Sequence, residues 1–166
     1  LLFIVKPSPV ERSDVFLSAV VGHIERLRRG AWKASGIEVT VEAASDATVW
    51  GNENQITQVL LNLVTNAEHA LAEAGEKRLR ISANRLGDGT QLVVSDSGHG
   101  MDETTRRRIF EPFFTTKPGT QGTGLGLSLS HSIVAAHGGR IEVESAMGRG
   151  ATFRISLPAS DPGLTA

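Results

Sequence analysis

The sequence predicts a domain of the α/β class, in which helices and strands are grouped around one hydrophobic core. The chain has 166 residues and 40% of them are hydrophobic, which suits one globular domain rather than a disordered segment. Segments with the helical period of 3.6 residues occur among segments in which apolar and polar residues alternate, as in half-buried strands. Many of the 18 glycines fall between positions 98 and 150, which indicates an irregular region with a specific purpose.

Composition excludes several classes of protein. The formal net charge is −1, so the chain lacks the positive field that attracts nucleic acids or anionic membranes. The basic run at 106–108 is interpreted as a solvated surface. There is no cysteine, which rules out disulfides and thiolate metal sites. The apolar residues 1–5 are too few to cross a membrane, and we expect a cytoplasmic location without membrane contact by this chain.

The first half of the chain predicts two helices separated by two strands. Ser13 is expected to cap a helix that ends at Gly30, because apolar residues between them follow the helical period. Strands are predicted at 37–42 and 49–50. Asn52 is expected to cap the second helix, with Gln55 as its capping-box partner, and Gly75 to end it.

The second half predicts four strands, one helix and a long irregular segment. Strands at 79–86 and 91–96 flank a hairpin turn at 87–89, and strands at 140–144 and 151–157 end the domain. A helix is predicted at 125–137, closed by two glycines. Residues 97–123 are irregular, with one helical turn at 105–110. An irregular segment of this length is typical of a functional loop.

A polar stripe runs along the second helix. Asn62, Asn66, His69 and Glu73 follow one another at spacings of four, three and four, so they share one face. Asparagine is a poor helix former because its side chain competes for backbone hydrogen bonds, and its amide oxygen is a good ligand for Mg²⁺. The stripe therefore indicates either a ligand site or a solvated face.

Asp96 ends an apolar strand and is followed by Gly98 and Gly100. A carboxylate beside backbone that a ligand can approach closely suits recognition of an exocyclic amine. The alternative is a turn aspartate that caps the next loop.

The segment GTGLGL at 122–127 precedes a helix. Exposed N–H groups and the positive end of the helix dipole make such a segment an anion site suited to phosphates. A dinucleotide fingerprint is excluded because its third glycine is Leu127 here, and no GxxxxGK[ST] motif occurs. His131 and His137 are six residues apart, so a metal pair on one helix face is not expected.

Four segments in this order closely resemble the boxes of the catalytic ATP-binding domain of sensor histidine kinases, whose superfamily includes gyrase, large heat-shock chaperones and mismatch-repair ATPases. They are similar to the N box (QVLLNLVTNA, 58–67), the first glycine box (DSGHGM, 96–101), the F box (FEPFFTTK, 110–117) and the second glycine box (GTGLGL, 122–127). The resemblance covers about residues 13–157. It implies a two-layer α/β sandwich of the Bergerat type, a mixed sheet with helices on one face, and a mobile lid at 110–121.

The resemblance also implies that the chain binds ATP and Mg²⁺. Asn66 would bind Mg²⁺, with Asn62 in support. Asp96 would accept a hydrogen bond from the adenine amino group, while Thr152 assists through water. The other implied contacts with ATP are Gly98, Gly100, Met101, His69, Lys117 at the γ-phosphate, and Gly122, Thr123, Gly124, Leu125, Gly126 and Leu127 around the phosphates.

The implied activity is transfer of the γ-phosphoryl group to a histidine on a separate dimerisation domain, in two-component signalling. Superfamily members that hydrolyse ATP carry a Glu at the position of Asn62, and an amide cannot act as that base, which favours a kinase. The sequence offers no acid or base of its own. The implied partners are the phosphoacceptor hairpin of the same dimeric kinase and a response regulator receiver domain.

The segment at 23–26 (HIER) does not match a phosphoacceptor pattern. We therefore expect residues 1–12 to be the tail of an upstream phosphoacceptor hairpin or a linker, 13–158 the catalytic domain and 159–166 a C-terminal tail. Two alternatives remain: a serine-directed regulatory kinase of the anti-sigma type, and a nucleotide-sensing module without transfer activity.

Overall fold

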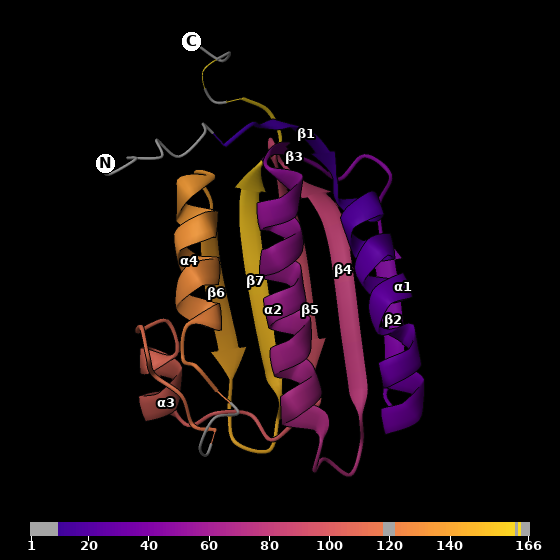
Figure 1. The fold of residues 1–166 in the computed structure, drawn as a ribbon, viewed down its shortest axis with the longest axis vertical. Coiled ribbons are helices and arrows are strands. Elements are labelled where there is room, and N and C mark those ends of the chain that lie inside the picture. The colour runs from indigo at the N-terminus through magenta and orange to yellow at the C-terminus, as the bar shows by residue number, and fades with distance from the viewer. Residues whose placement is uncertain (1–9, 118–121, 162, 164–166) are drawn as a thin grey trace, which may run out of the picture.

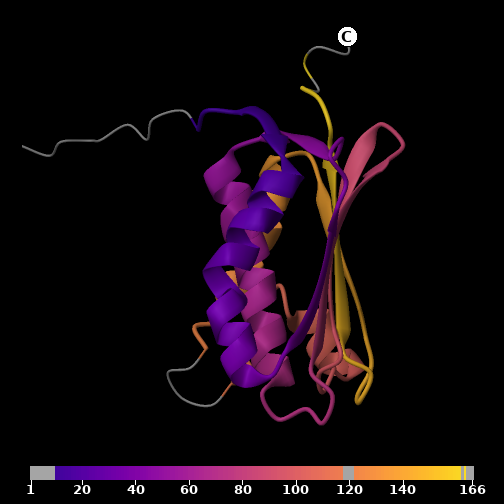
Figure 2. The same ribbon diagram turned by 90° about the vertical axis from the view of Figure 1, so that its right-hand side faces the viewer.

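A five-stranded mixed sheet and the helices on one of its faces form the two layers of the molecule (Figures 1 and 2). The structure is a computed structural model that describes residues 10–117, 122–161 and 163. Strand order in the main sheet is β2-β4-β5-β7-β6. Strands β2 and β4 are parallel, and the other neighbours are antiparallel. The predicted α/β sandwich with a mixed sheet is therefore confirmed.

The elements follow the chain in a simple order. The helices are α1 (Leu17–Ser35), α2 (Glu53–Leu71), α3 (Glu103–Arg108) and α4 (Gly126–Ala136). The main-sheet strands are β2 (Glu38–Ala43), β4 (Arg78–Leu86), β5 (Gly89–Asp96), β6 (Arg140–Ser145) and β7 (Ala151–Pro158). Strands β1 (Ser13–Phe16) and β3 (Thr48–Gly51) form a separate two-stranded sheet. None of the helices in the described part of the chain is long and apolar enough to cross a membrane.

The core lies between the helices and the sheet. Side chains of β5 and β7 alternate between buried and half-buried along each strand, because successive residues point to opposite faces. The buried set packs under α2, whose fully buried leucines include Leu60, Leu63 and Leu71. In the part of the chain that the structure describes, no helix covers the opposite face of the sheet (Figure 2), which carries ion pairs such as Arg80–Glu42 at 2.6 Å.

The prediction for the first helix is wrong at both ends. Ser13 does not cap it but lies in β1, opposite Gly51 of β3, and the helix begins at Leu17, whose N–H donates to the Ala47 carbonyl (2.9 Å). The helix continues past Gly30 to Ser35. Trp32, which is 4% exposed, packs into the core from this extra turn, and its burial exceeds the cost of about 1 kcal/mol for a helical glycine.

The second helix begins as predicted but ends earlier, at Leu71. The Asn52 side chain accepts a hydrogen bond from the Gln55 N–H (2.9 Å). The Asn52 N–H donates to Nε2 of the buried His137 (3.1 Å), so this imidazole takes the place of the Gln55 side chain in the expected capping box. The predicted strand at 49–50 is present as β3 but pairs with β1.

Several predictions concern residues outside the described part. Residues 1–9 of the predicted tail or linker at 1–12 lie outside the described part. The same holds for residues 118–121 of the predicted lid at 110–121. The helical turn predicted at 105–110 is present as α3, two residues earlier in the chain. Its N-cap Asp102 accepts from the Thr105 N–H (2.7 Å).

Candidate functional site

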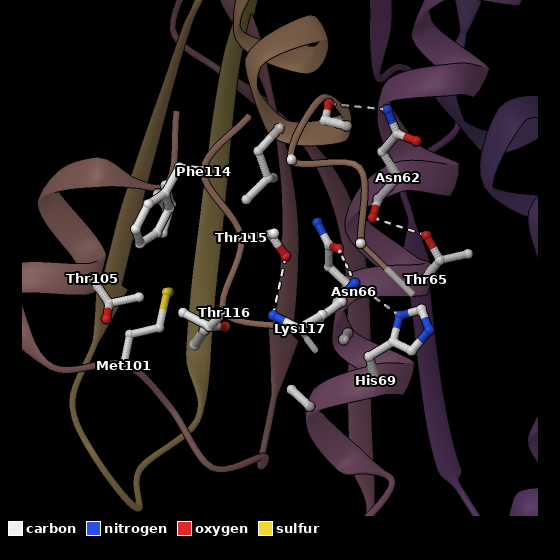
Figure 3. Close-up of a pocket in the computed structure, with 18 of the residues that line it drawn as sticks. Asn62, Thr65, Asn66, His69, Met101, Thr105, Phe114, Thr115, Thr116 and Lys117 are labelled. Atoms are coloured by element: carbon white, nitrogen blue, oxygen red, sulfur yellow. Dashed lines mark hydrogen bonds between the residues drawn. The ribbon is translucent and has the colours of Figure 1, made fainter. Parts of the chain in front are cut away.

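A cavity of about 500 Å³ opens between α2, the end of β5, α3 and the segment before α4 (Figure 3). Asn62, Asn66 and His69 of the polar stripe form one wall, whereas Glu73 lies beyond the end of α2 at Leu71 and is not among the lining residues. Twelve of the predicted site residues line the cavity: Asn62, Asn66, His69, Asp96, Gly100, Met101, Lys117, Gly122, Thr123, Gly124, Gly126 and Leu127. Gly98, Leu125 and Thr152 do not. The four sequence boxes thus converge on one space, which their separation in the chain does not require.

Asp96 presents a carboxylate at the floor of the cavity. It is 9% exposed, and Oδ1 accepts a hydrogen bond from the Gly98 N–H at 2.8 Å. Burial raises the pKa of the carboxyl above its ordinary value, and the Gly98 N–H partly opposes that shift. A carboxylate has more acceptor positions than one N–H occupies, so Asp96 retains capacity for an amino group.

The two glycines after Asp96 pack against protein backbone. A Cβ at Gly98 would lie 2.6 Å from the Ala70 carbonyl oxygen of α2, which explains why Gly98 is outside the cavity lining. Gly100 has a φ of +70°, and its Cβ would lie 2.0 Å from the Ala146 carbonyl oxygen. Both glycines therefore let the loop fit between α2 and the β6–β7 turn, and only Gly100 reaches the cavity.

Lys117 crosses the cavity and contacts the α2 stripe (Figure 3). Its ammonium donates to Asn66 Oδ1 at 3.3 Å and lies 3.2 Å from His69 Nδ1. Burial lowers the pKa of Lys117. The Asn66 amide oxygen thus faces the cavity, where it accepts a hydrogen bond from the positively charged Lys117 ammonium.

Asn62 lies one helical turn before Asn66 and interacts with α4 instead. Its Nδ2 donates to the Gly126 carbonyl and to Ser130 Oγ, both at 3.2 Å. Leu125, the residue before the helix, is 42% exposed and is not among the residues that line the cavity. The start of α4 is therefore fixed next to α2, and backbone from 122 to 126 borders the space between them.

Thr152 does not line the cavity. Along β7 the alternation of faces places Ala151 and Phe153 in the cavity lining. The Thr152 hydroxyl lies on the opposite face, 2.7 Å from the Ser95 hydroxyl of β5. The strand was therefore predicted correctly, and its residues that line the cavity are Ala151 and Phe153 rather than Thr152.

Other lining residues were not singled out by the sequence. They are Thr65, Ala67, Ala70, His99, Thr105, Ile109, Phe114, Thr115, Thr116, Ala151 and Phe153. Thr65 and Ala70 follow Asn62 and Asn66 by three and four positions, so helix geometry alone could have found them. The apolar ones, such as Ile109, look like ordinary core residues in the sequence.

The sequence matches the family described as Histidine kinase-, DNA gyrase B-, and HSP90-like ATPase over residues 51–161. Among curated proteins, it is similar to the sensor histidine kinase ZraS of Escherichia coli (strain K12), with 36% identity over 163 residues. That alignment covers 96% of this chain and 34% of ZraS. The chain thus spans about a third of the length of this relative.

Solved structures agree with this match. The catalytic domain of the histidine kinase ThkA has a TM-score of 0.80 and 33% identity, with coverage of 90% of this chain and 96% of that domain. ThkA in complex with the response regulator protein TrrA has a TM-score of 0.75 and 28% identity, and the match covers 90% of this chain and 42% of that one. Full-length ShkA in complex with AMPPNP has a TM-score of 0.78 and 29% identity, and the match covers 92% of this chain and 32% of the ShkA chain. The chain belongs to the histidine kinase-, DNA gyrase B- and HSP90-like ATPase family, as a catalytic domain of the sensor histidine kinase type.

Proposed function

We propose that this domain binds ATP with Mg²⁺ in the cavity and transfers the γ-phosphoryl group to a histidine on a separate dimerisation domain, within two-component signalling. The observation that carries the proposal is the arrangement around one cavity: an amide stripe on α2, a buried carboxylate at the end of β5 and the N-terminus of α4. These groups suit an amine, a metal and phosphates respectively.

Each end of the nucleotide has a proposed partner. Asp96 accepts a hydrogen bond from the adenine amino group, because its carboxylate is buried and offers only acceptors. The phosphates lie against the backbone N–H groups that precede and open α4, where the helix dipole favours negative charge. Lys117 moves from Asn66 to the γ-phosphate, since an ammonium bonds more strongly to a phosphate oxygen than to a neutral amide.

Asn66 fits the role of metal ligand. Its Oδ1 already accepts from a cation, the Lys117 ammonium, and an amide oxygen is a hard ligand suited to Mg²⁺. In the described residues no three His, Cys, Asp or Glu side chains converge, so Asn66 would share the metal with phosphate oxygens. A bound Mg²⁺ would neutralise the phosphate charge and so assist transfer.

The remaining contribution of the domain is to position the phosphoryl group. An imidazole nucleophile needs little activation, and Asn62 cannot take a proton from water because it is an amide that donates to α4. Positioning and electrostatic stabilisation therefore account for the rate. The acceptor histidine would lie on the phosphoacceptor hairpin of the same dimeric kinase, and a response regulator receiver domain would take the phosphoryl group next. The complex of the related ThkA with TrrA supports that second partner.

Incubation with γ-labelled ATP and Mg²⁺ tests the proposal. The isolated chain should bind ATP without labelling itself and should hydrolyse it only slowly, and addition of a separately made phosphoacceptor hairpin should give acid-labile phosphate on the hairpin. Acid-stable phosphate on a serine would favour the anti-sigma type of kinase. ATP binding without transfer to any hairpin would favour a nucleotide-sensing module.

A further inference from the structure

Asn62 connects the two helices that border the proposed phosphate site. Each of the two hydrogens on its Nδ2 has an acceptor on α4: the Gly126 carbonyl and the Ser130 hydroxyl, both at 3.2 Å. We propose that Asn62 is a positioning residue that fastens the first turn of α4 to α2 and thereby sets where the α4 N-terminus meets the phosphates. This inference rests on the proposed function for its effect on nucleotide binding.

The first turn of α4 has few other anchors. The buried side chains of α4 are Ser130, Ile133 and Val134, all beyond the first turn. Its N-cap, Leu125, provides no side-chain capping bond and is 42% exposed. Gly126 has no side chain to pack. Leu127, half-buried against the core, is the first apolar contact of the helix. The Phe113 N–H donates to the Gly124 carbonyl just before the helix (2.9 Å), and the amide of Asn62 is the polar group that joins the first turn itself to α2.

The Asn62 amide also lies beside Gly126. A Cβ built on Gly126 would lie 3.8–3.9 Å from the amide atoms of Asn62, which is ordinary van der Waals contact. The two helices thus meet at the amide group itself. Ser130 is 0% exposed, so its hydroxyl is shielded from water and its loss of the Asn62 partner would not be compensated by solvent.

The chemistry of the contact requires a donor at position 62. The Gly126 carbonyl can only accept, so a carboxylate there would face another acceptor with no proton between them. Asn62 therefore has a role of its own beyond the absence of a general base. A Glu at this position would release α4 as well as introduce a carboxylate, and we do not expect it to produce an efficient ATPase.

Loss of the Asn62 contacts should affect the phosphate end of the nucleotide more than the adenine end. In the described part of the chain Asp96, at the proposed adenine end, has no hydrogen bond to α4 and accepts from Gly98 instead, whereas the α4 N-terminus borders the proposed phosphate site. Loosening the first turn should therefore weaken the part of the affinity that depends on phosphates and leave the nucleoside part intact. A general loss of structure would weaken both parts equally.

Asn62→Leu tests the inference, because leucine is neutral and nearly the same shape as asparagine but has no hydrogen-bond donor. Calorimetry should give about tenfold weaker binding of ADP, corresponding to two lost neutral hydrogen bonds, and adenosine affinity within about twofold of wild type. Amide exchange at 126–130 in the free protein should become faster. Asn62→Gln, which retains the donor, should recover part of the ADP affinity.

Ser132→Ala is the matched control, because among the described residues the Ser132 hydroxyl bonds only to the Ser128 carbonyl of its own helix. It should leave ADP affinity and exchange at 126–130 unchanged. Wild-type ADP affinity in Asn62→Leu, or equal losses for ADP and adenosine, would overturn the inference. If the wild type bound no nucleotide while Asn62→Leu still accelerated exchange at 126–130, the proposed function would fail and the fastening of α4 would stand.

Discussion

Replacing Asp96 by asparagine separates the role of its charge from the role of its shape. The carboxylate is 9% exposed, and Oδ1 accepts from the Gly98 N–H at 2.8 Å. Asparagine keeps the size of the side chain and an oxygen for Gly98, but it removes the negative charge. Any change in the variant therefore reports on the lost charge and on the replacement of one acceptor oxygen by an NH₂ donor, rather than on a cavity.

The expected loss of ATP affinity follows from the type of hydrogen bond. A bond to a charged group contributes about 1.5–3 kcal/mol, and a neutral one about 0.5–1.5 kcal/mol. The difference of about 1–1.5 kcal/mol corresponds to roughly tenfold weaker ATP binding in Asp96→Asn. Asp96→Ala also removes the acceptor of the Gly98 N–H and should cost up to about a hundredfold.

The same substitution should stabilise the nucleotide-free protein at neutral pH. Burial raises the pKa of Asp96 above the ordinary value of 3.8, so the native state holds its proton more tightly than the unfolded chain does. The protonated Asp96 side chain therefore contributes its full stability below pH values near the ordinary pKa. That contribution is lost as the pH rises through the raised pKa of the folded protein. At about pH 7 the buried charge lowers the free energy of unfolding, and Asp96→Asn removes that penalty.

Two assays together check this reasoning. Calorimetry compares ATP and GTP for the wild type and Asp96→Asn, and urea unfolding at several pH values compares their stabilities. We expect the wild type to prefer ATP, because the guanine carbonyl would face the Asp96 carboxylate, and the stability advantage of the variant to grow from about pH 4 to pH 7. Equal binding of GTP and ATP by the wild type would refute the role of Asp96 in adenine recognition. A lower stability of Asp96→Asn than of the wild type at neutral pH would refute the reasoning on the buried charge.

Three further outcomes are expected. Asn66→Ala should weaken ATP binding about tenfold or more with Mg²⁺ and much less in EDTA; equal losses in both would mean a structural role. Glu68→Ala should lower the free energy of unfolding by about 2 kcal/mol, because the half-buried Glu68 accepts from Arg28 (3.0 Å) and Trp32 (2.7 Å). Urea unfolding measures this, and Glu68→Gln, which keeps the Trp32 bond, should lose less. Amide exchange at 115–117 should slow when a non-hydrolysable ATP analogue binds, as Lys117 moves to the phosphate; protection already present in the free protein would contradict this.

Local sequence signals predicted α2 and its polar stripe well. The periodic apolar residues, the Asn52 cap and the spacing of Asn62, Asn66 and His69 are all encoded within one helix, so no long-range information was needed. The start of α1 was different. Ser13 has the chemistry of an N-cap, but pairing with Gly51, far along the chain, recruits it into β1, and local reasoning cannot detect such a partner.

The site was predicted less completely than the fold, because side-chain direction and partners depend on pairing between distant segments. Strand β7 was located correctly, but a strand has a period of two, so neighbouring side chains point to opposite faces and the sequence does not show which of them borders the cavity. The register of Asp96 with Ala151 decides that Ala151, not Thr152, borders the site.

Asn62 illustrates the same limit on a helix. Its position one turn before Asn66 suggested a role defined by the missing carboxylate, and the sequence contains no sign of its partners on α4. Those partners lie 64 and 68 residues further along the chain. The identity of a residue thus restricts its chemistry to donating or accepting, while the fold selects the groups it meets. An amide at position 62 is therefore better explained by the two acceptors it joins than by the base it replaces.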